Sequence, residues 1–318
     1  METIIEVKNL KKSYNGLIAV NRIHFRVYRG EIFGFLGPNG AGKTTTINML
    51  TGLARITEGQ IFLKGKDVTR NIKSVQKIIG VVPDENNLYE ELSGFDNLCF
   101  CGALYGMRKK DREKRARELL NLFGLDNAGR RKFSEYSKGM KRKLTLAAAL
   151  MHEPEILFLD EPTTGIDVAS VRQIRKLIRE LNRKGATVFL TTHYIEEAER
   201  LCHRVAFIDR GKIITTDTVE KLLDANRDTH LVDIRFKPVS NDVSQLPEKL
   251  HRRFPDISCT LKDSGTIRLT SRQVPDIAPV VNYLASEGFF VLEARLIKPT
   301  LEEAFVKATG IEVDLMNK

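Results

Sequence analysis

The chain has 318 residues, of which 42% are hydrophobic and 29% charged, values typical of a soluble globular protein that is long enough for two domains. No apolar stretch approaches the ~18 residues that a membrane-spanning helix needs, and the N-terminus lacks the apolar core of a signal peptide. The four cysteines have no metal-ligand spacing and are too few for a disulfide framework. We therefore expect a cytosolic protein unless a partner holds it at a membrane.

The formal net charge of +10 lies entirely before residue 229, because residues 229–318 contain twelve basic and twelve acidic residues. The basic residues cluster at 108–117, 130–132 and 138–143. A nucleic-acid-binding face is one interpretation, but the runs lack interleaved aromatic residues, and a solvated helix face is the commoner explanation. We favour a third interpretation, in which this segment faces an anionic membrane surface or a membrane partner.

Alternating apolar residues predict two antiparallel strands at the start of the chain, around Tyr14. The residues that alternate are Ile5, Val7, Ile23, Phe25 and Val27. A continuous apolar strand follows at 31–36, and a short strand pair is expected at 59–68. The chain is therefore expected to open with an antiparallel β subdomain.

Residues 37–44 read Gly-Pro-Asn-Gly-Ala-Gly-Lys-Thr and join the buried strand to a helix. The glycines permit positive φ, so consecutive backbone N–H groups can converge on nucleotide phosphates, and the helix N-terminus adds partial positive charge. Lys43 supplies a charge to the β- and γ-oxygens, Thr44 offers a hydroxyl to Mg²⁺, and Thr45 reaches a neighbouring phosphate oxygen. A glycine-rich turn before an ordinary helix is the alternative, but it leaves six matched positions unexplained. This motif predicts nucleotide binding.

Further motifs follow the P-loop in a definite order. Residues 93–151 have helical periodicity and predict a helical subdomain inserted into the core. The later motifs are Tyr-Ser-Lys-Gly-Met at 136–140, an apolar strand that ends in Asp160 and Glu161, Pro-Thr-Thr-Gly-Ile-Asp at 162–167, and a strand followed by His193. Strands that alternate with helices between 156 and 208 indicate a mainly parallel sheet with helices on its faces.

The order and spacing of these motifs resemble the nucleotide-binding domain of ABC transporters over residues 1–226. The resemblance implies an α/β fold: a P-loop NTPase core of mainly parallel sheet, with an antiparallel β subdomain and a helical subdomain at about 93–151. It also implies ATP and Mg²⁺ as ligands. The residues expected to contact the nucleotide are Tyr14, Val20, Gly37, Asn39, Gly40, Ala41, Gly42, Lys43, Thr44, Thr45, Asp84, Ser137, Gly139 and Asp167.

By the same resemblance, Tyr14 stacks on adenine with Val20 beside it, although a tyrosine that simply packs in the core is the alternative. Mg²⁺ is expected at Thr44, Asp84 and Asp160. The family has glutamine where this chain has Asp84, and aspartate keeps only the acceptor function of that side chain. A shifted register that places Glu85 in the site stays open at this stage.

The resemblance assigns catalysis to Glu161 as general base, with Lys43 on the phosphates and His193 helping to orient the attacking water. A structural role for Glu161, capping the next turn, is disfavoured because a buried Asp-Glu pair without a cation is costly. Ser137 and Gly139 would bind the nucleotide held by a second subunit, and Asp167 would lie at the interface between the two subunits. Catalysis then requires a dimer, which we expect to be a homodimer.

Past residue 226 the pattern changes to strand-helix-strand-strand-helix-strand, which is compatible with a small α+β ferredoxin-like domain at 227–318. Thr300 and Glu303 have the spacing of a capping box at the start of a last helix. No catalytic constellation lies in this half, so we expect a regulatory or dimer-supporting role. The domain looks like the one that follows the ATPase in type-2 exporters of the ABC class.

The resemblance implies the ATP-hydrolysing motor subunit of an exporter, which drives a separately encoded transmembrane permease from the cytoplasmic side of the cell membrane and is peripheral to it. A soluble ABC-type ATPase acting on nucleic acid or the ribosome is disfavoured by the single cassette and the lack of a heptad run. We therefore expect no nucleic-acid partner. A nucleotide sensor without turnover is disfavoured because Lys43, Asp160, Glu161 and His193 are all present.

Overall fold

The computed structural model describes residues 2–85, 87–224, 230–238, 243–297 and 300–310. The chain divides into two compact units, Met1–Val219 with Phe305–Lys318, and Glu220–Ala304. The boundary expected at 226 lies outside the described residues. The last helix, α10 (Leu301–Thr309), is divided between the units, because the ring of Phe305 packs edge-on against that of Phe207, 5.1 Å away. The second unit, Glu220–Ala304, begins and ends earlier in the sequence than the domain expected at 227–318.

A six-stranded sheet forms the centre of the first unit, in the order β10-β9-β3-β8-β7-β6. Its strands are β3 (Ile32–Leu36), β6 (Ile79–Val82), β7 (Ile156–Asp160), β8 (Thr187–Thr192), β9 (Arg204–Asp209) and β10 (Lys212–Thr218). Neighbours are parallel except β9 and β10, and β10 was not predicted. Every residue of β3, β7 and β8 is buried, as in a parallel sheet covered on both faces. The carboxyl ends of these three strands meet at one edge.

A second, antiparallel sheet confirms the predicted β subdomain. It has the order β2-β1-β4-β5, with β1 (Thr3–Tyr14), β2 (Leu17–Tyr28), β4 (Glu58–Leu63) and β5 (Lys66–Asp67). Phe25 of this sheet lies 5.7 Å, between ring centroids, from Phe33 and from Phe189 of the parallel sheet. Ile47 and Leu50 of α1 (Lys43–Leu50) belong to the same core. The two sheets and α1 thus share one apolar core beneath the P-loop.

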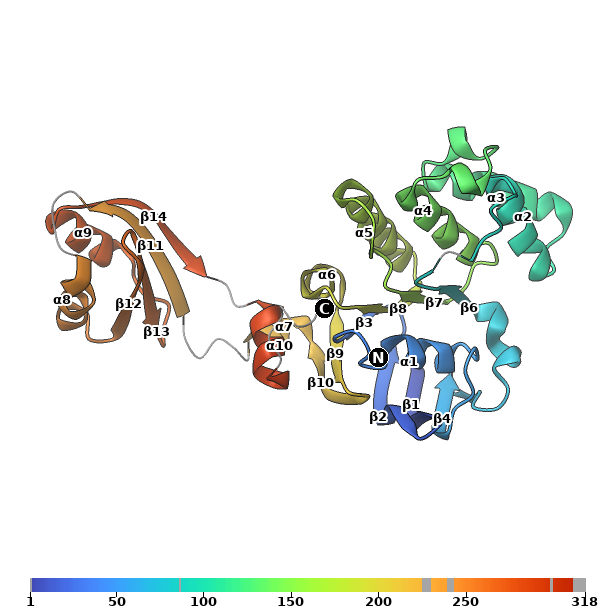
Figure 1. Ribbon diagram of the computed structural model, residues 1–318, viewed down its shortest axis with the longest axis horizontal. Helices are drawn as coiled ribbons and strands as arrows, with labels where there is room; N and C mark the ends of the chain where they lie inside the picture. The colour runs from blue at the N-terminus through green and yellow to red at the C-terminus, as the bar shows by residue number, and fades with distance from the viewer. Residues whose placement is uncertain (1, 86, 225–229, 239–242, 298–299, 311–318) are drawn as a thin grey trace. The chain divides into compact units, whose positions relative to one another are not determined.

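Three helices make up the predicted helical subdomain: α2 (Gly94–Leu104), α3 (Lys109–Leu122) and α4 (Lys138–Ala149). Figure 1 shows them grouped beyond β6 and β7. Ser93 and Ser137 cap α2 and α4, accepting hydrogen bonds from backbone N–H groups three residues later. Two more helices, α5 (Val168–Arg183) and α6 (Ile195–Leu201), follow β7 and β8, and α7 (Val219–Asp224) follows β10. Within the described parts of the chain, none of the helices has the length and apolar character to cross a bilayer.

The second unit has the predicted order of elements, β11 (His230–Pro238), α8 (Leu246–Arg253), β12 (Ile257–Asp263), β13 (Thr266–Ser271), α9 (Ala278–Ser286) and β14 (Phe289–Ile297). All neighbours in its sheet, β12-β13-β11-β14, are antiparallel. Leu250 of α8 and Leu284 of α9 pack with Ile234 in its core. This arrangement is compatible with a ferredoxin-like sandwich. The capping box is present, since Thr300 Oγ1 accepts from Glu303 N and Glu303 Oε2 accepts from Thr300 N.

Candidate functional site

The P-loop connects β3 to α1, and its last glycine cannot be replaced without moving the backbone. Gly42 has φ 104° and forms the N-cap of α1. A Cβ atom on Gly42 would lie 2.5 Å from the carbonyl oxygen of Ala19 in β2. Only glycine combines this backbone conformation with such a close approach. The loop is thereby held against β2, with the first turn of α1 behind it.

A cleft of about 430 Å³ lies over the P-loop and α1. Its walls come from β2, the P-loop, the loop after β6, and the segments after β7 and β8. The lining residues are Ala19, Asn39, Gly40, Gly42, Lys43, Thr44, Thr45, Asp84, Glu161, Thr164 and His193. Most of the predicted nucleotide-binding and catalytic residues of one chain therefore lie in a single cleft, because the strands that precede them are parallel neighbours.

Lys43, Glu161 and His193 form a cluster in this cleft. Lys43 Nζ lies 3.2 Å from Glu161 Oε1 and also donates to the carbonyl oxygens of Gly37 and Pro38. His193 Nδ1 lies 2.8 Å from Glu161 Oε2. Burial disfavours the charged carboxylate, but the His193 hydrogen bond and the Lys43 charge outweigh it and lower the pKa of Glu161. Glu161 is therefore ionised at neutral pH, and Nδ1 of His193 is the donor in this hydrogen bond.

Asp160 and Asp84 approach the cleft from two different strands. Asp160 is almost fully buried, and its Oδ1 accepts a hydrogen bond from Thr191 Oγ1. Asp84 lines the cleft, whereas Glu85 lines a neighbouring hollow, so this geometry favours Asp84 over a shifted register. Burial, and then the negative charge of Asp160, raise the pKa of Asp84. A cation placed here would stabilise the ionised form of Asp84.

The chemistry of these side chains fits Mg²⁺ only with help from other oxygen atoms. Asp84 and Thr44 present oxygen atoms to the cleft, and hard cations prefer oxygen ligands. Across the described residues, however, no group of three or more His, Cys, Asp or Glu side chains is arranged to hold a metal ion by itself. A magnesium ion in this cleft would thus depend on phosphate and water oxygens for most of its ligands.

Ser137, Gly139 and Asp167 lie outside this cleft. Ser137 is exposed at the N-cap of α4. Gly139 lies against the start of α5, where an added Cβ would be 2.3 Å from Ser170 Oγ and 3.4 Å from Asp167 Oδ2. No residue of the 136–140 segment is among the described residues that line the cleft. The geometry is therefore compatible with a segment that contacts the nucleotide of another subunit.

The two residues expected around adenine differ in their exposure. Tyr14 is 45% exposed at the end of β1, and Lys12 Nζ lies 4.4 Å from the centroid of its ring. Val20 has no exposed surface and lies in the core, and its expected contact with the nucleotide stays a prediction. Its Cγ2 lies instead beneath Gly42, 3.2 Å from the position that a Cβ would take. Ala19, the preceding residue of β2, lines the cleft.

Two buried charged residues near the cleft were missed in the sequence. Arg142 is 4% exposed and hydrogen-bonds to the segments after β6 and β7, so it is not part of a membrane-facing basic surface. Glu197 is fully buried in α6 and accepts hydrogen bonds from the Thr163 and Thr192 hydroxyls. In the sequence, no signal separates Glu197 from the exposed Glu196. Arg142 lies between the half-buried Lys141 and Lys143, so no sequence signal marks its burial either.

Comparison with known proteins connects this cleft to a family. The family model described as ABC transporter matches residues 20–164. The linearmycin resistance ATP-binding protein LnrL of Bacillus subtilis is 35% identical over 96% of this chain and 98% of its own length. The daunorubicin resistance ATP-binding protein DrrA3 of Streptomyces coeruleorubidus is 37% identical over 97% of this chain and 96% of its own. The Nod factor export ATP-binding protein I of Paraburkholderia xenovorans is 34% identical over 98% of this chain and 99% of its own length.

Solved structures agree with these relatives. A structure described as the ATP-binding subunit of an ABC transporter is 30% identical, with a TM-score of 0.64, and covers 70% of this chain and 92% of its own. A dimeric ATP-binding cassette in a post-hydrolysis state, bound to ADP and phosphate, is 25% identical with a TM-score of 0.64, covering 68% of this chain and 99% of its own. This chain belongs to the family of ABC transporter ATP-binding proteins and is an ATPase of that family.

Proposed function

We propose that this chain is the motor subunit of an exporter and drives a separately encoded permease from the cytoplasmic side of the cell membrane. The observation that carries the proposal is the cleft in which the P-loop lysine, a buried carboxylate and a histidine contact one another. Relatives that match nearly the whole chain are named for drug resistance and Nod factor export. These names favour export over an action on nucleic acid or the ribosome.

We infer that Glu161 is the general base of ATP hydrolysis. A water oxygen attacks the γ-phosphorus, the bond from phosphorus to the β–γ bridging oxygen breaks, and the water proton passes to the Glu161 carboxylate. His193 fixes the orientation of this carboxylate, and Lys43 balances charge on the phosphate oxygens. The γ-phosphate and Glu161 are both anionic, so they compete for Lys43. ATP binding is therefore expected to draw Lys43 away from Glu161.

The remaining contacts follow from the same placement of the triphosphate. We propose that the P-loop backbone N–H groups and Thr45 bind the phosphates, and that Tyr14 stacks on adenine from the edge of β1. Thr44, Asp84 and Asp160 would hold Mg²⁺, which when bound neutralises phosphate charge. Asp160 would lie behind the residues that line the cleft, because it is almost fully buried and already accepts a hydrogen bond from Thr191.

We propose that two copies of the chain form the active assembly. ABC ATP-binding subunits act as dimers together with transmembrane components, and a homodimer is the simplest form for a chain that carries both halves of the site. Ser137 and Gly139 lie outside the cleft of their own chain, and Gly139 lies close to Asp167. In the dimer they would face the nucleotide held by the partner's P-loop. ATP closes the dimer because it binds the closed form more tightly than the open one.

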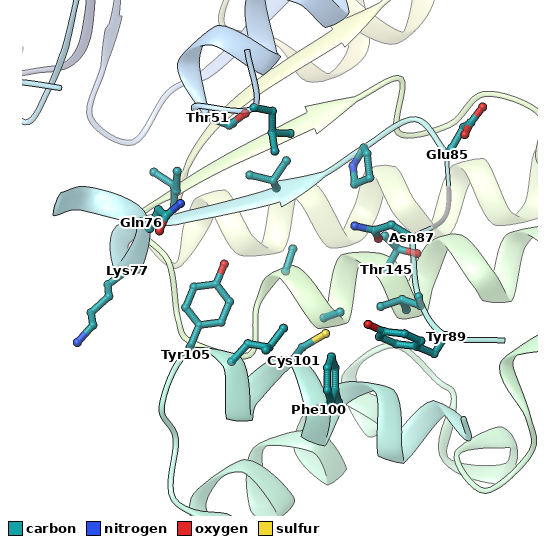
Figure 2. A pocket seen from close by; sticks show the side chains of 18 of the residues that line it. Thr51, Gln76, Lys77, Glu85, Asn87, Tyr89, Phe100, Cys101, Tyr105 and Thr145 are labelled. Atoms are coloured by element: carbon teal, nitrogen blue, oxygen red, sulfur yellow. The ribbon is translucent and has the colours of Figure 1, made fainter. Parts of the chain in front are cut away.

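We further propose that the permease docks in a hollow of about 880 Å³ beside β6. Three aromatic side chains line this hollow: Phe100 of α2, Tyr105 just after α2, and Tyr89 of the segment before it (Figure 2). Leu53 and Leu104 in its lining are 71% and 70% exposed, so it offers apolar surface to a partner. Pro83 and Glu85 also line it, on either side of Asp84. A partner seated here would press on the loop that carries Asp84 into the cleft.

The motor is tested with purified wild-type chain, Glu161→Gln and the control Glu196→Gln, a carboxylate that is 69% exposed in α6. We expect Glu161→Gln to lower kcat by about 10²–10⁴-fold, the contribution of a general base, and to accumulate as an ATP-bound dimer detected by size exclusion. Glu196→Gln should match wild type. Unchanged hydrolysis in Glu161→Gln would show that Glu161 is not the base. Specific activity that does not depend on protein concentration in a rigorously isolated monomer would contradict the dimer.

Docking is tested separately with Leu104→Glu and with Leu122→Glu, a control on α3 outside the hollow. A charge in the hollow should abolish co-purification with the membrane protein that accompanies the wild-type chain, whereas Leu122→Glu should retain it. Equal retention by both variants would place the permease elsewhere.

A further inference from the structure

Arg142, a buried residue of α4, joins the two loops that carry Asp84 and Glu161. It is 4% exposed. Among the described residues, its guanidinium donates only to main-chain carbonyl oxygens: Nε to Pro162 (3.0 Å), Nη1 to Pro83 and to Asp84 (3.1 Å), and Nη2 to Asp160 (2.6 Å) and to Glu161 (2.9 Å). The loop after β6 and the segment after β7 are thereby tied to one side chain.

These contacts use the full donor capacity of the side chain. A guanidinium carries five N–H groups in a fixed plane, and five carbonyl oxygens receive them. Burial lowers the pKa of Arg142, while the nearby Asp84 and Asp160 carboxylates favour its charged form. A lysine has three donors on a single atom and cannot reproduce this planar pattern. Arginine is therefore the residue that can hold both segments at once.

The pattern of acceptors determines how two side chains of the cleft are directed. The carbonyls of Asp160 and Glu161 belong to the peptide planes on either side of Glu161, and those of Pro83 and Asp84 flank Asp84 in the same way. With both flanking planes held, φ and ψ of the residue between them are fixed, and so is the direction of its Cα–Cβ bond. Glu161 has φ 47°, a left-handed conformation that a non-glycine residue adopts only when its surroundings impose it.

We propose that Arg142 is a positioning residue for ATP hydrolysis, which fixes the directions of Glu161 and Asp84 relative to each other and to α4. Its guanidinium donates to main-chain atoms of the segments that carry these two acids, so Arg142 acts through Glu161 and Asp84. Because α4 begins just after Ser137, a displacement of that segment reaches both acids through Arg142. Loss of the guanidinium should therefore impair turnover much more than nucleotide binding.

The test uses the full chain with Arg142→Met, which keeps the length and removes all donors, and Arg142→Lys, which keeps the charge. Lys143→Gln, at the next and half-buried position of α4, is the control. We expect Arg142→Met to lower kcat by about 100-fold, the cost of misplacing a reacting group by about 1 Å, and Arg142→Lys by about tenfold. Affinity for a fluorescent ATP analogue should stay within about threefold in both variants, and Lys143→Gln should match wild type.

A second measurement separates positioning of Glu161 from a merely structural role. Single-turnover hydrolysis is compared for Arg142→Met in the wild-type and Glu161→Gln backgrounds. If Arg142 acts through the Glu161 carboxylate, Arg142→Met should lower the single-turnover rate by less than about twofold in the Glu161→Gln background, where that carboxylate is absent. Equal losses in both backgrounds, or parallel losses of ATP affinity and kcat, would overturn the proposal. If Arg142→Met does not fold, Arg142→Lys is measured in the same two backgrounds, and wild-type kcat in Arg142→Lys would likewise overturn it.

Discussion

Replacing Glu197 with alanine should destabilise the first unit, because this buried carboxylate connects two loops of the cleft. Its Oε2 accepts hydrogen bonds from Thr163 Oγ1 (2.7 Å) and Thr192 Oγ1 (3.0 Å), and its Oε1 lies 3.8 Å from Arg175 Nε. Truncation to alanine leaves the two buried threonine hydroxyls without this acceptor. Each unsatisfied hydroxyl lowers the free energy of unfolding by about 1–3 kcal/mol. Removing a buried charge offsets part of that cost. We expect a net loss of about 2–4 kcal/mol in the free energy of unfolding.

Glu197→Gln should behave differently, because the amide keeps an oxygen acceptor for both hydroxyls and carries no charge. Burial raises the pKa of Glu197 above its ordinary 4.5, despite hydrogen bonds from Thr163 and Thr192 that favour the charged form. The folded chain then binds this proton more tightly than the unfolded chain does. Tighter binding of this proton adds to the free energy of unfolding. That contribution is fully present below pH 4.5 and is lost as the pH rises through the folded-state pKa of Glu197. Relative to wild type, Glu197→Gln should therefore become more stable between pH 5 and pH 8.

The assay is urea unfolding followed by circular dichroism, since the chain has no tryptophan. Wild type, Glu197→Ala, Glu197→Gln and the exposed control Glu196→Ala are compared at both pH values. The reasoning is refuted if Glu197→Ala unfolds within about 0.5 kcal/mol of wild type, the range of an ordinary surface substitution. It is also refuted if the difference between Glu197→Gln and wild type does not change with pH.

Three further substitutions test other parts of the site. Asp84→Asn should leave nucleotide affinity nearly intact and change kcat, and unchanged hydrolysis would remove Asp84 from the mechanism. Gly139→Ala places a Cβ 2.9 Å from Ser170 Cβ, so α4 must move from α5; thermal unfolding should show a loss of about 1–3 kcal/mol, and ATP-dependent dimers should be lost. Tyr136→Phe removes the hydrogen bond from Tyr136 Oη to the Ala128 carbonyl (2.7 Å) and should cost about 0.5–1.5 kcal/mol in urea unfolding.

The elements predicted best from the sequence are those whose burial leaves a continuous or periodic apolar pattern. The strand Ile156–Asp160 is buried throughout and ends at Asp160, as predicted. The strand Lys212–Thr218 was missed, because it lies at the edge of its sheet and its residues are mostly polar and only partly buried. The helix Val219–Asp224 has only six residues, too few to show helical periodicity.

Val20 shows how an irregular strand defeats a pattern. Simple alternation from Ile23, Phe25 and Val27 places position 20 on the opposite, open face of β2. The pairing of β1 with β2 has register shifts on both sides of the Lys12–Val20 pair, and these turn Val20 into the core. Bulges depend on the partner strand, so the alternation within β2 alone does not give the direction of the Val20 side chain.

Arg142 and Glu197 were not predictable for a different reason, which also explains what they do. A parallel strand that ends at a binding edge leaves main-chain carbonyls without a partner in the sheet, and buried carbonyls must be hydrogen-bonded. The segments after β6 and β7 meet this need through the guanidinium of Arg142. Every residue has a main-chain carbonyl, so no sequence pattern marks the carbonyls that need a side-chain donor such as Arg142. The acids that face the nucleotide are recognisable by type, whereas the groups that direct them become visible only once the strand ends lie side by side.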